Sequence, residues 1–433
     1  MTDGAASTGL DVFSMLMDSL TWPADVMQEF KRNQLAQLLR HAKANVPFYK
    51  TRLDCVVKPD GSIDWSRWNE IPILTRAELQ KNKKQMIARR LPPGHGPTRR
   101  FFSSGSTGVP VEVVSTHLAI SVQMALVSRY FTLRGVDPMG RRAQFWFKPP
   151  KGYAFKNDVT WLTPTTSGQD GGTLIGNRKL SFAGWLNLLE EHRISIFNEF
   201  ATTMVQLAHE NLQRKKRVHL DAVIPYGMGL SAAEYDLLAE SFGAKVIVPY
   251  SSKEGGLIAF SCGHGSNFHV CEEAVHCEYQ DADHTGDDEK EIIITPIFSS
   301  AQPLIRYRQG DIVMPGSGCS CGIKLPVLRR IVGRADDVFH LAGHPVPVVG
   351  ISDGLVIQHL KASAFQIAQT GENDLEVRFV SQTKATPIAR RVLTHHIRRA
   401  LSHPVVVSYS RRNELPLTLG GKQKRFTREW QQT

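Results

Sequence analysis

A short run dense in glycine and hydroxyl side chains is the first candidate for chemistry. It reads SSGSTGVP, and its candidate phosphate contacts are Ser103, Ser104, Gly105, Ser106, Thr107 and Gly108. Glycine lets the backbone bend close to a ligand, and the N–H and O–H groups can donate to phosphate oxygens. The run lacks the Gly-Lys-Ser/Thr of a Walker-type loop, and linkers share its composition. Taken alone, it leaves phosphate binding and a plain loop both open.

Cysteine spacing supplies a second candidate. Five of the six cysteines lie between Cys262 and Cys321. Cys319 and Cys321 flank a single residue, and Cys262 with His269 forms an earlier pair. Two such pairs can meet at one tetrahedral zinc, and four N/S ligands with no open position would make the site structural. Reduced, buried thiols are the alternative, and the rival ligands are His264, Cys271 and Cys277.

Four further motifs follow the glycine-rich run in order along the chain. They are Tyr250-Ser-Ser-Lys-Glu254, Tyr307-Arg-Gln-Gly-Asp311, Gly333-Arg-Ala-Asp336 and Pro416-Leu-Thr-Leu-Gly-Gly-Lys-Gln-Lys-Arg425. A carboxylate is a hard ligand for Mg²⁺ and can accept hydrogen bonds from two ribose hydroxyls. A lysine can neutralise a crowded phosphoryl centre. A single acidic residue is most simply explained as a surface residue. Only the five motifs taken together indicate a nucleotide-binding site.

The elements expected around these motifs place them in loops and at strand ends. Residues 100–103 and 109–114 read as two strands joined by the glycine-rich run. From about residue 181 to 261, helical and extended patterns alternate. This alternation is typical of a parallel sheet covered by helices. Ligands bind such sheets beyond the carboxyl ends of the strands, where this chain has residues 226–230 and 250–254.

Two domains are expected. Residues 1–335 would form a large α/β domain that carries most of the motifs and includes a zinc-binding stretch at 262–321. Residues 336–433 turn to short strands around a helix with Thr386 and Pro387 at its start. They predict a small, mobile α+β domain.

Composition and charge narrow the class of protein. Apolar residues make up 42% of the 433 residues, as in ordinary globular proteins. The formal net charge is +11, but the cations lie in scattered pairs and short clusters, which favours small anionic ligands over nucleic acid. No stretch approaches the roughly 18 apolar residues of a membrane span, and the N-terminus does not read as a secretory signal. A cytoplasmic enzyme without nucleic-acid or membrane partners is expected, and a homodimer is left open.

The five motifs in this order resemble the adenylate-forming superfamily of acyl-CoA synthetases, peptide-synthetase adenylation domains and luciferases. Within it, the phrase PLIRYRQGD and the pair Cys-Ser-Cys-Gly followed by LPVLRRIVGRADD are most similar to the phenylacetate–CoA ligase family. The likeness covers essentially the whole chain. It implies that MgATP activates a carboxylic acid, expected to be aromatic, as acyl-AMP with release of pyrophosphate. The acyl group would then pass to coenzyme A.

The resemblance also implies roles for single residues. It assigns the glycine-rich run to the β- and γ-phosphates, Tyr250 to stacking on adenine and Asp311 to the ribose hydroxyls. It places Arg334 near the ribose and Glu254 on Mg²⁺.

In the C-terminal part, Lys422 would neutralise the acyl carboxylate and α-phosphate during adenylation, with Lys424 as the nearby alternative. Asp336 would be the hinge of the small domain. Members of the family also carry a zinc site like that expected for Cys262, His269, Cys319 and Cys321.

Some positions differ from the sequence motifs of the family. Val111 stands where a lysine often occurs, Ser251 and Lys253 replace a glycine and a hydroxyl residue, and 227–230 read Gly-Met-Gly-Leu in place of Gly-Glu-x-Leu. Lys253 would place a mobile cation beside the phosphates or the acyl carboxylate. The acid is expected to bind near residues 146–153 and 226–229. Two rival functions remain: transfer to a carrier-protein thiol or an amine, and a zinc-stabilised binding protein without catalysis.

Overall fold

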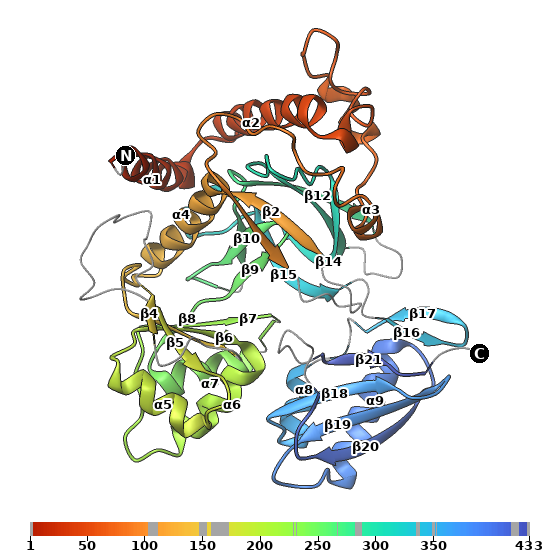
Figure 1. The fold of residues 1–433 in the computed structure, drawn as a ribbon. Coiled ribbons are helices and arrows are strands. Elements are labelled where there is room, and N and C mark those ends of the chain that lie inside the picture. Colours follow the sequence, from red (N-terminus) through yellow and green to blue (C-terminus); the bar gives the residue numbers. More distant parts are fainter. Residues whose placement is uncertain are drawn as a thin grey trace.

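The chain forms two large sheets with covering helices and a smaller C-terminal unit, shown by the computed structural model (Figure 1). The described residues are 3–102, 111–146, 154–156, 173–227, 229–230, 232–265, 267–281, 288–334, 338–348, 351, 353–416 and 424–430.

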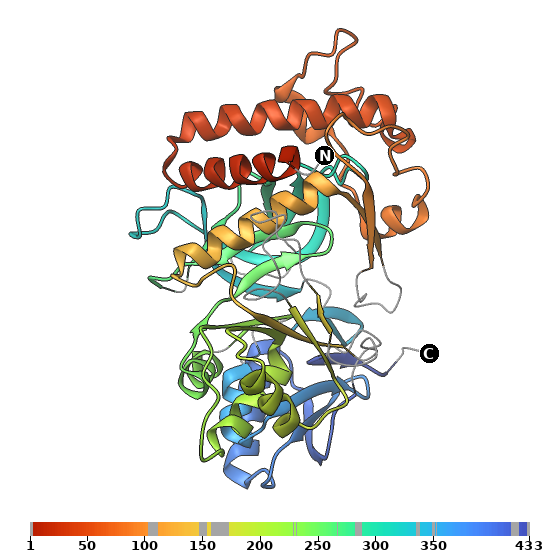
Figure 2. The ribbon, with the colours of Figure 1, turned by 60° about the vertical axis from the view of Figure 1, so that its left-hand side comes forward.

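Three helices stack on one side of the first large sheet (Figure 2). They are α1 (Asp3–Asp18), α2 (Ala24–Asn45) and α4 (His117–Leu133). Leu35, Leu38, Leu39 and Ala42 of α2 are all buried. Their spacing of three and four residues puts them on one helical face, as predicted. Short 3-10 helices cover Ser19–Thr21, Pro47–Tyr49 and Trp65–Glu70.

A short helix and a hairpin carry the first motifs. Helix α3 (Arg76–Lys81) begins at the predicted capping box, in which Thr75 and Glu78 hydrogen-bond each other's backbone N–H groups. Strands β1 (Thr98–Phe102) and β2 (Glu112–Thr116) pair antiparallel. The two predicted strands are therefore confirmed, and the glycine-rich run between them lies outside the described residues.

The first large sheet is antiparallel and has the order β12-β13-β14-β15-β11-β10-β9. Its strands are β9 (Pro249–Ser252), β10 (Gly256–Ser261), β11 (Phe268–Val270), β12 (Val275–Asp281), β13 (Lys290–Pro296), β14 (Tyr307–Gly316) and β15 (Val327–Arg334). The second motif lies on β9 and the turn after it, the third at the start of β14, and Gly333 and Arg334 of the fourth end β15. One sheet therefore holds residues of three motifs that are distant in sequence.

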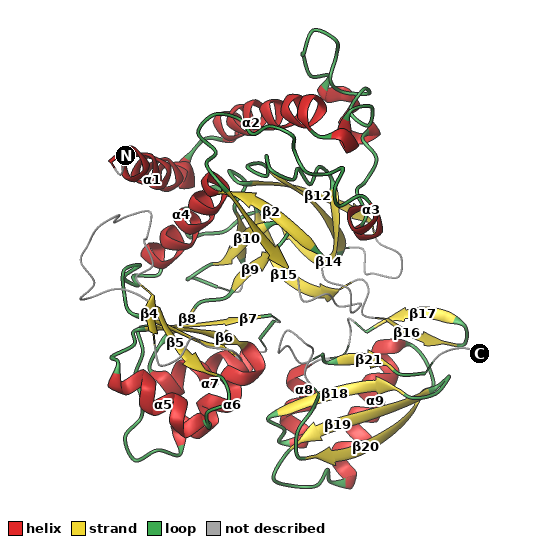
Figure 3. Cartoon of the chain, viewed as in Figure 1, coloured by secondary structure: helices red, strands yellow, loops and turns green. Residues whose placement is uncertain are grey.

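The second large sheet has the order β4-β5-β3-β6-β7-β8, and all neighbours except β4 run parallel. Its strands are β3 (Arg142–Trp146), β4 (Ala154–Lys156), β5 (Thr173–Asn177), β6 (Ile196–Phe200), β7 (Ala222–Tyr226) and β8 (Lys245–Val246). Helices α5 (Phe182–Glu191), α6 (Ala201–Leu212) and α7 (Ala232–Phe242) cover the face away from the first sheet (Figure 3). The predicted parallel sheet wrapped by helices is confirmed here, whereas the antiparallel sheet was not anticipated.

The C-terminal unit contains a hairpin, a four-stranded sheet of order β20-β19-β18-β21 and two helices. Its elements are β16 (Val338–Leu341), β17 (His344–Pro347), α8 (Asp353–Leu360), β18 (Ala364–Gln369), β19 (Asp374–Val380), α9 (Pro387–Leu401), β20 (Val406–Arg412) and β21 (Phe426–Arg428). Thr386 caps α9 through a hydrogen bond to the backbone N–H of Ala389, with Pro387 at the first helical position, as predicted.

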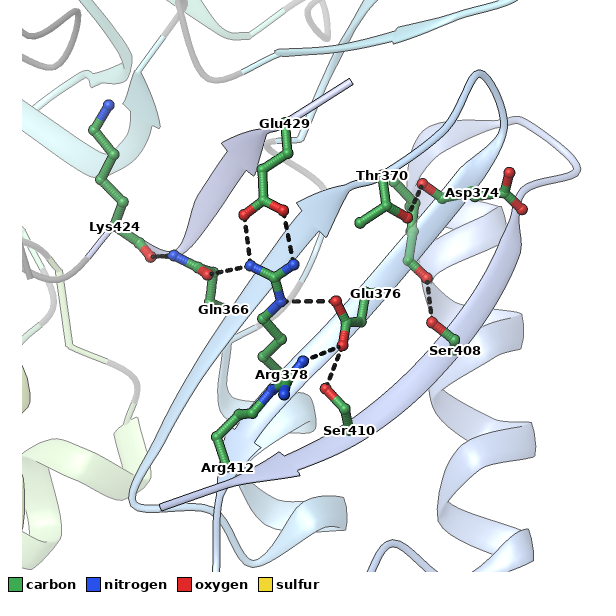
Figure 4. Close-up of polar contacts among 11 residues, drawn as sticks. Gln366, Thr370, Asp374, Glu376, Arg378, Ser408, Ser410, Arg412, Lys424 and Glu429 are labelled. Carbon is green, nitrogen blue, oxygen red and sulfur yellow. Dashed lines mark hydrogen bonds and ion pairs between the residues drawn. The ribbon is translucent and has the colours of Figure 1, made fainter. Parts of the chain in front are cut away.

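The last strand is fixed by polar contacts as well as by its ladder (Figure 4). Arg378 on β19 binds both carboxylate oxygens of Glu429, at 2.5 and 2.8 Å, and also Glu376 at 2.8 Å. Such bidentate pairs fix geometry as well as charge. Glu429, just after β21, is thereby held against the sheet. Within the described part of the chain, no helix combines the length and the apolar character that crossing a bilayer requires.

Candidate active site and zinc centre

Asp311 lies where strands β14 and β15 pair. Its partner in the ladder is Arg334, whose Nη1 is 3.3 Å from Asp311 Oδ1. The carboxyl group is mostly buried, while Arg334 is one-third exposed. A partly desolvated carboxylate beside a guanidinium can accept hydrogen bonds from a sugar and face an anion together with it. The two residues predicted to meet the ribose are therefore neighbours in space.

Tyr250 on β9 completes this group. Its hydroxyl donates to Asp311 Oδ2 at 2.8 Å, and Gln309 Nε2 donates to the same oxygen at 2.6 Å and to the tyrosine oxygen at 3.0 Å. The Ser252 hydroxyl donates to Gln309 Oε1 at 2.8 Å. Burial, followed by the Asp311 charge, raises the pKa of Tyr250 well above its usual value, so the phenol stays neutral.

Gln309 was missed from the sequence. It lies two residues before Asp311 on the same strand, and side chains two apart in a strand share a face. That alternation is the signal that could have found it. Glutamine is uncharged and common on surfaces, so nothing else distinguished it.

Glu254 lies in the turn between β9 and β10 and faces a second residue that the sequence did not reveal. Arg76 Nη1 of α3 is 3.8 Å from Glu254 Oε1. Burial raises the pKa of Glu254, and the Arg76 charge acts against that rise. A mostly buried carboxylate with a single loose ion pair suits a hard cation such as Mg²⁺, which prefers oxygen ligands. The chemistry and the burial of the Glu254 carboxylate therefore both suit the predicted Mg²⁺ ligand.

Lys253 is exposed, and its ammonium lies 6.0 Å from the centre of the Phe101 ring on β1. Phe101 comes just before the glycine-rich run, so Lys253 stands beside the hairpin that carries the run. The contacts predicted for Ser103–Gly108, Asp336 and Lys422 lie outside the described residues, and their roles stay predictions. Lys424 is described: its backbone oxygen accepts from Gln366 Nε2 at 3.1 Å, while its side chain points away from that contact (Figure 4).

The four predicted zinc ligands come together. Cys262 follows β10, His269 lies on β11, and Cys319 and Cys321 belong to the turn between β14 and β15. Their ligand atoms all lie within 4.8 Å of one another. Cys262 Sγ is 3.6 Å from Cys319 Sγ, and Cys321 Sγ is 3.2 Å from His269 Nε2. A tetrahedral zinc with Zn–S bonds of about 2.3 Å needs sulfurs about 3.8 Å apart, so this donor set fits the ion.

The acid–base states of His269 and Cys319 favour the forms that bind zinc, whereas Cys262 would lose its proton only on binding the ion. Burial lowers the pKa of His269, so its imidazole is neutral at pH 7, as a zinc ligand must be. Burial raises the pKa of Cys262 to about 11, whereas a backbone hydrogen bond at Cys321 lowers the pKa of Cys319.

Neither rival cysteine belongs to this group of ligand atoms. Cys271 is buried and lies 3.9 Å from Arg129 Nη2, and burial raises its pKa to about 12. Burial also raises the pKa of Cys277. His264 contributes a backbone N–H to Cys262 Sγ at 3.4 Å.

Part of the predicted acid-binding region is described. The side chain of Trp146 and residues 147–153 lie outside the described part, as does Met228. Tyr226 ends β7, and its ring centre lies 4.6 Å from that of Phe200 at the end of β6. Two aromatic rings therefore lie at the carboxyl edge of the parallel sheet, and acid binding there stays a prediction.

Comparison with known proteins finds one similarity in sequence and several in fold. No family model matches. A phenylacetate-coenzyme A ligase of Escherichia coli (strain K12) is 23% identical over 353 residues, which are 75% of this chain and 74% of that protein. The resemblance predicted from the motifs is thereby confirmed.

Solved structures confirm the fold. A 2-hydroxyisobutyryl-CoA ligase in the postadenylation state is 16% identical and has a TM-score of 0.73, over 94% of this chain and 90% of that one. The same ligase in the thioesterification state is 17% identical and has a TM-score of 0.57, over 95% and 92%. An acyl acid amido synthetase is 12% identical, with a TM-score of 0.57 over 92% and 86%.

Proposed function

We propose that this chain is an AMP-forming acid–thiol ligase that activates a carboxylic acid and transfers the acyl group to coenzyme A. The observation that carries the proposal is the group of Tyr250, Gln309, Asp311 and Arg334, which three sequence motifs bring to one place. Similarity to a phenylacetate-coenzyme A ligase over three-quarters of the chain supports it. The acid is aromatic in this proposal.

In the first half-reaction, a carboxylate oxygen of the acid attacks the α-phosphorus of ATP, and the bond to the pyrophosphate oxygen breaks. Asp311 accepts from the ribose hydroxyls, and Arg334 lies beside them. Glu254 would hold Mg²⁺, which supplies charge neutralisation for the departing pyrophosphate. Lys422 reaches the acyl carboxylate and α-phosphate, where two anions must approach each other.

In the second half-reaction, the sulfur of coenzyme A attacks the acyl carbon, and AMP leaves with the electrons of the broken C–O bond. The thiol proton is lost to solvent. The small domain turns about Asp336 between the two steps, which removes Lys422 and admits the thiol. Zinc bound by Cys262, His269, Cys319 and Cys321 would be structural, because four protein ligands leave no open position.

The acceptor needs its own test, because an acyl acid amido synthetase shares this fold and the fold therefore does not fix the acceptor. Exchange of labelled pyrophosphate into ATP, dependent on an aromatic acid, is expected from the purified protein. Thioester formation is expected with coenzyme A and not with amines or a carrier protein. Absence of exchange across a broad set of acids would favour the rival binding protein, and exchange with product formed only on an amine would change the acceptor.

A further inference from the structure

A charged pair lies at the carboxyl edge of the parallel sheet, away from the residues given roles so far. Arg178 follows β5, and Glu199 is on β6, next to its last residue. The Arg178 guanidinium binds Glu199 Oε1, and both side chains are at least nine-tenths buried. Sequence neighbours do not explain the pair, because 20 residues separate its members.

Arg178 is held in place from several sides. Its Nε donates to the backbone oxygen of Phe145 at 3.1 Å. Its guanidinium carbon lies 5.1 Å from the centre of the Phe200 ring and 5.8 Å from that of Trp185. Contacts with aromatic faces and a fixed hydrogen bond orient a guanidinium firmly. The cation therefore has a defined direction toward Glu199.

Glu199 uses only one of its two oxygens. Oε1 accepts from Arg178 and from the backbone N–H of Phe200 at 2.7 Å. Oε2 is buried and has no hydrogen-bond partner among the described residues. An unpartnered acceptor in a desolvated place is costly, so this oxygen gains from any donor that reaches it. Burial also raises the pKa of Glu199, while Arg178 opposes that rise.

The Arg178–Glu199 pair lies at the edge of the sheet where a substrate is expected to bind. Open parallel sheets bind ligands beyond the carboxyl ends of their strands, and the pair lies there together with Tyr226. Glu199 and Pro225 are partners in the ladder, as are Phe200 and Tyr226. Strand β7 also packs against β9, the strand that carries Tyr250. The pair therefore lies on the edge that leads to the nucleotide site.

We propose that Glu199 Oε2 accepts a hydrogen bond from a hydroxyl or amino substituent of the carboxylic acid, so that the enzyme selects acids carrying such a donor. This inference rests on the proposed ligase function and names its substrate class. The aromatic rings of Phe200 and Tyr226 would cover the apolar part of the acid, and the fixed Arg178 keeps the carboxylate turned toward the substituent. An acid without a donor leaves Oε2 buried and unpaired, which is the basis of strong discrimination in enzymes.

The first test compares matched acids with the unaltered enzyme. Phenylacetate and benzoate are each paired with their hydroxy and amino derivatives, with the substituent at each ring position, and kcat/KM is measured by pyrophosphate exchange. At least one donor-bearing acid should exceed its parent by about tenfold or more. Equal or lower values for every donor-bearing acid would overturn the inference.

The second test uses Glu199→Gln. The amide oxygen should face Arg178 and the Phe200 N–H, because both are donors, so the amide nitrogen takes the place of Oε2 and presents a donor. The preferred amino acid should lose most of its advantage, whereas a hydroxy acid should lose less because its oxygen can accept. Activity with the unsubstituted acid should fall less than activity with the donor-bearing acid, since the unsubstituted acid makes no hydrogen bond there.

Glu191→Gln is the matched control, since Glu191 is exposed at the end of α5 in the same part of the molecule. An equal loss with all acids in Glu199→Gln would make the pair structural and would overturn the inference. If the unaltered protein exchanged pyrophosphate with no acid, the proposed function would fail first. Calorimetric binding of the same acid pairs would then decide the inference, and either equal affinity within pairs or no binding would overturn it.

Discussion

The two oxygens of Asp311 have different partners. Oδ1 faces Arg334, and Oδ2 accepts from Tyr250 and Gln309. Arg334 and Tyr250 belong to other strands of the same sheet and Gln309 to the same strand, so the carboxylate is oriented before any ligand arrives. Such preorganisation costs nothing at the moment of binding.

We expect Asp311→Asn to weaken ATP binding. Hydrogen bonds to a charged group contribute about 1.5–3 kcal/mol, so the KM for ATP should rise roughly ten- to a hundredfold while the KM for the acid changes little. Steady-state pyrophosphate exchange with ATP varied at saturating acid measures this. Asp236→Asn is the control, since Asp236 is exposed on α7. An unchanged KM for ATP would remove Asp311 from the nucleotide site.

Single residues can be predicted from the sequence when they belong to a motif. The residues that orient them by hydrogen bonds or ion pairs cannot be predicted in this way. Tyr250 and Asp311 were predicted and do meet. Gln309 and Arg76 were not, because an amide and a surface-like arginine become informative only when folding places them beside a carboxylate. Glu199 was missed for the same reason.

Among the elements, the β10–β11 and β14–β15 connections lie close together in space. Each brings ligands to one place: Cys262 and His269 come from the first pair of strands, and Cys319 and Cys321 come from the turn of the second. Strands β11 and β15 are also neighbours in the sheet. A metal here would link the two hairpins at the middle of the antiparallel sheet.

Freshly purified protein is expected to contain about one zinc per chain, because a tetrahedral site binds one ion. Cys321→Ser should abolish it and lower the free energy of unfolding by roughly 3–5 kcal/mol, the upper range for single substitutions. Elemental analysis and urea unfolding measure the two effects. Cys55→Ser should leave both unchanged, since Cys55 is far from the group in sequence and is not one of its ligands. A metal-free protein of full stability would end the zinc proposal.

Elements were predictable where the signal was local. Alternating helices and strands gave the parallel sheet, and Thr75 and Thr386 gave helix starts. The antiparallel sheet could not be derived in the same way, because its central pairs, such as β11 with β15, join segments about 60 residues apart. Hydrophobic alternation marks a strand without naming its partner.

Across the whole molecule, one buried ion pair joins the C-terminal unit to the parallel-sheet region. Arg425 Nη2 is 3.2 Å from Glu234 Oε1 on α7, and both side chains are almost fully buried. The guanidinium also lies 5.1 Å from the centre of the Phe365 ring of β18. Any large rotation of the small domain must break this pair and hydrate both charges. The predicted boundary near residues 335 and 336 lies outside the described residues and stays a prediction.

Glu234→Ala should therefore disfavour the present orientation of the small domain. Removing one partner of a buried pair costs about 3–5 kcal/mol, because the other charge is left buried. The rate of acyl-AMP formation and the rate of thioester formation from supplied acyl-AMP and coenzyme A should therefore change by different factors. Rapid-quench assays of the two half-reactions separate these effects. Glu240→Ala, an exposed position on the same helix, is the control. Equal slowing of both steps would mean that the pair only stabilises the fold.

Lys422→Ala should slow adenylation by about 10²–10³-fold, the effect of losing one preorganised charge partner, and leave the second step intact. Comparing ATP-driven thioester formation with the reaction from synthetic acyl-AMP measures this. Lys424→Ala is the matched variant, and full retention of activity in Lys422→Ala would transfer the role to Lys424. Loss of both steps in equal measure would argue against alternation of the domain.

The C-terminal sheet also sets the distance that the segment carrying Lys422 must span. Lys422 lies in the 13 residues that connect β20 to β21, and these strands occupy opposite edges of a four-stranded sheet. The edges are only about 15 Å apart, since neighbouring strands are about 4.8 Å apart, whereas 13 extended residues reach about 43 Å. The connection is therefore longer than the distance between the strands that it joins. A small primary amine added at tens of millimolar should partly restore adenylation to Lys422→Ala, because it can supply the missing positive charge at the α-phosphate.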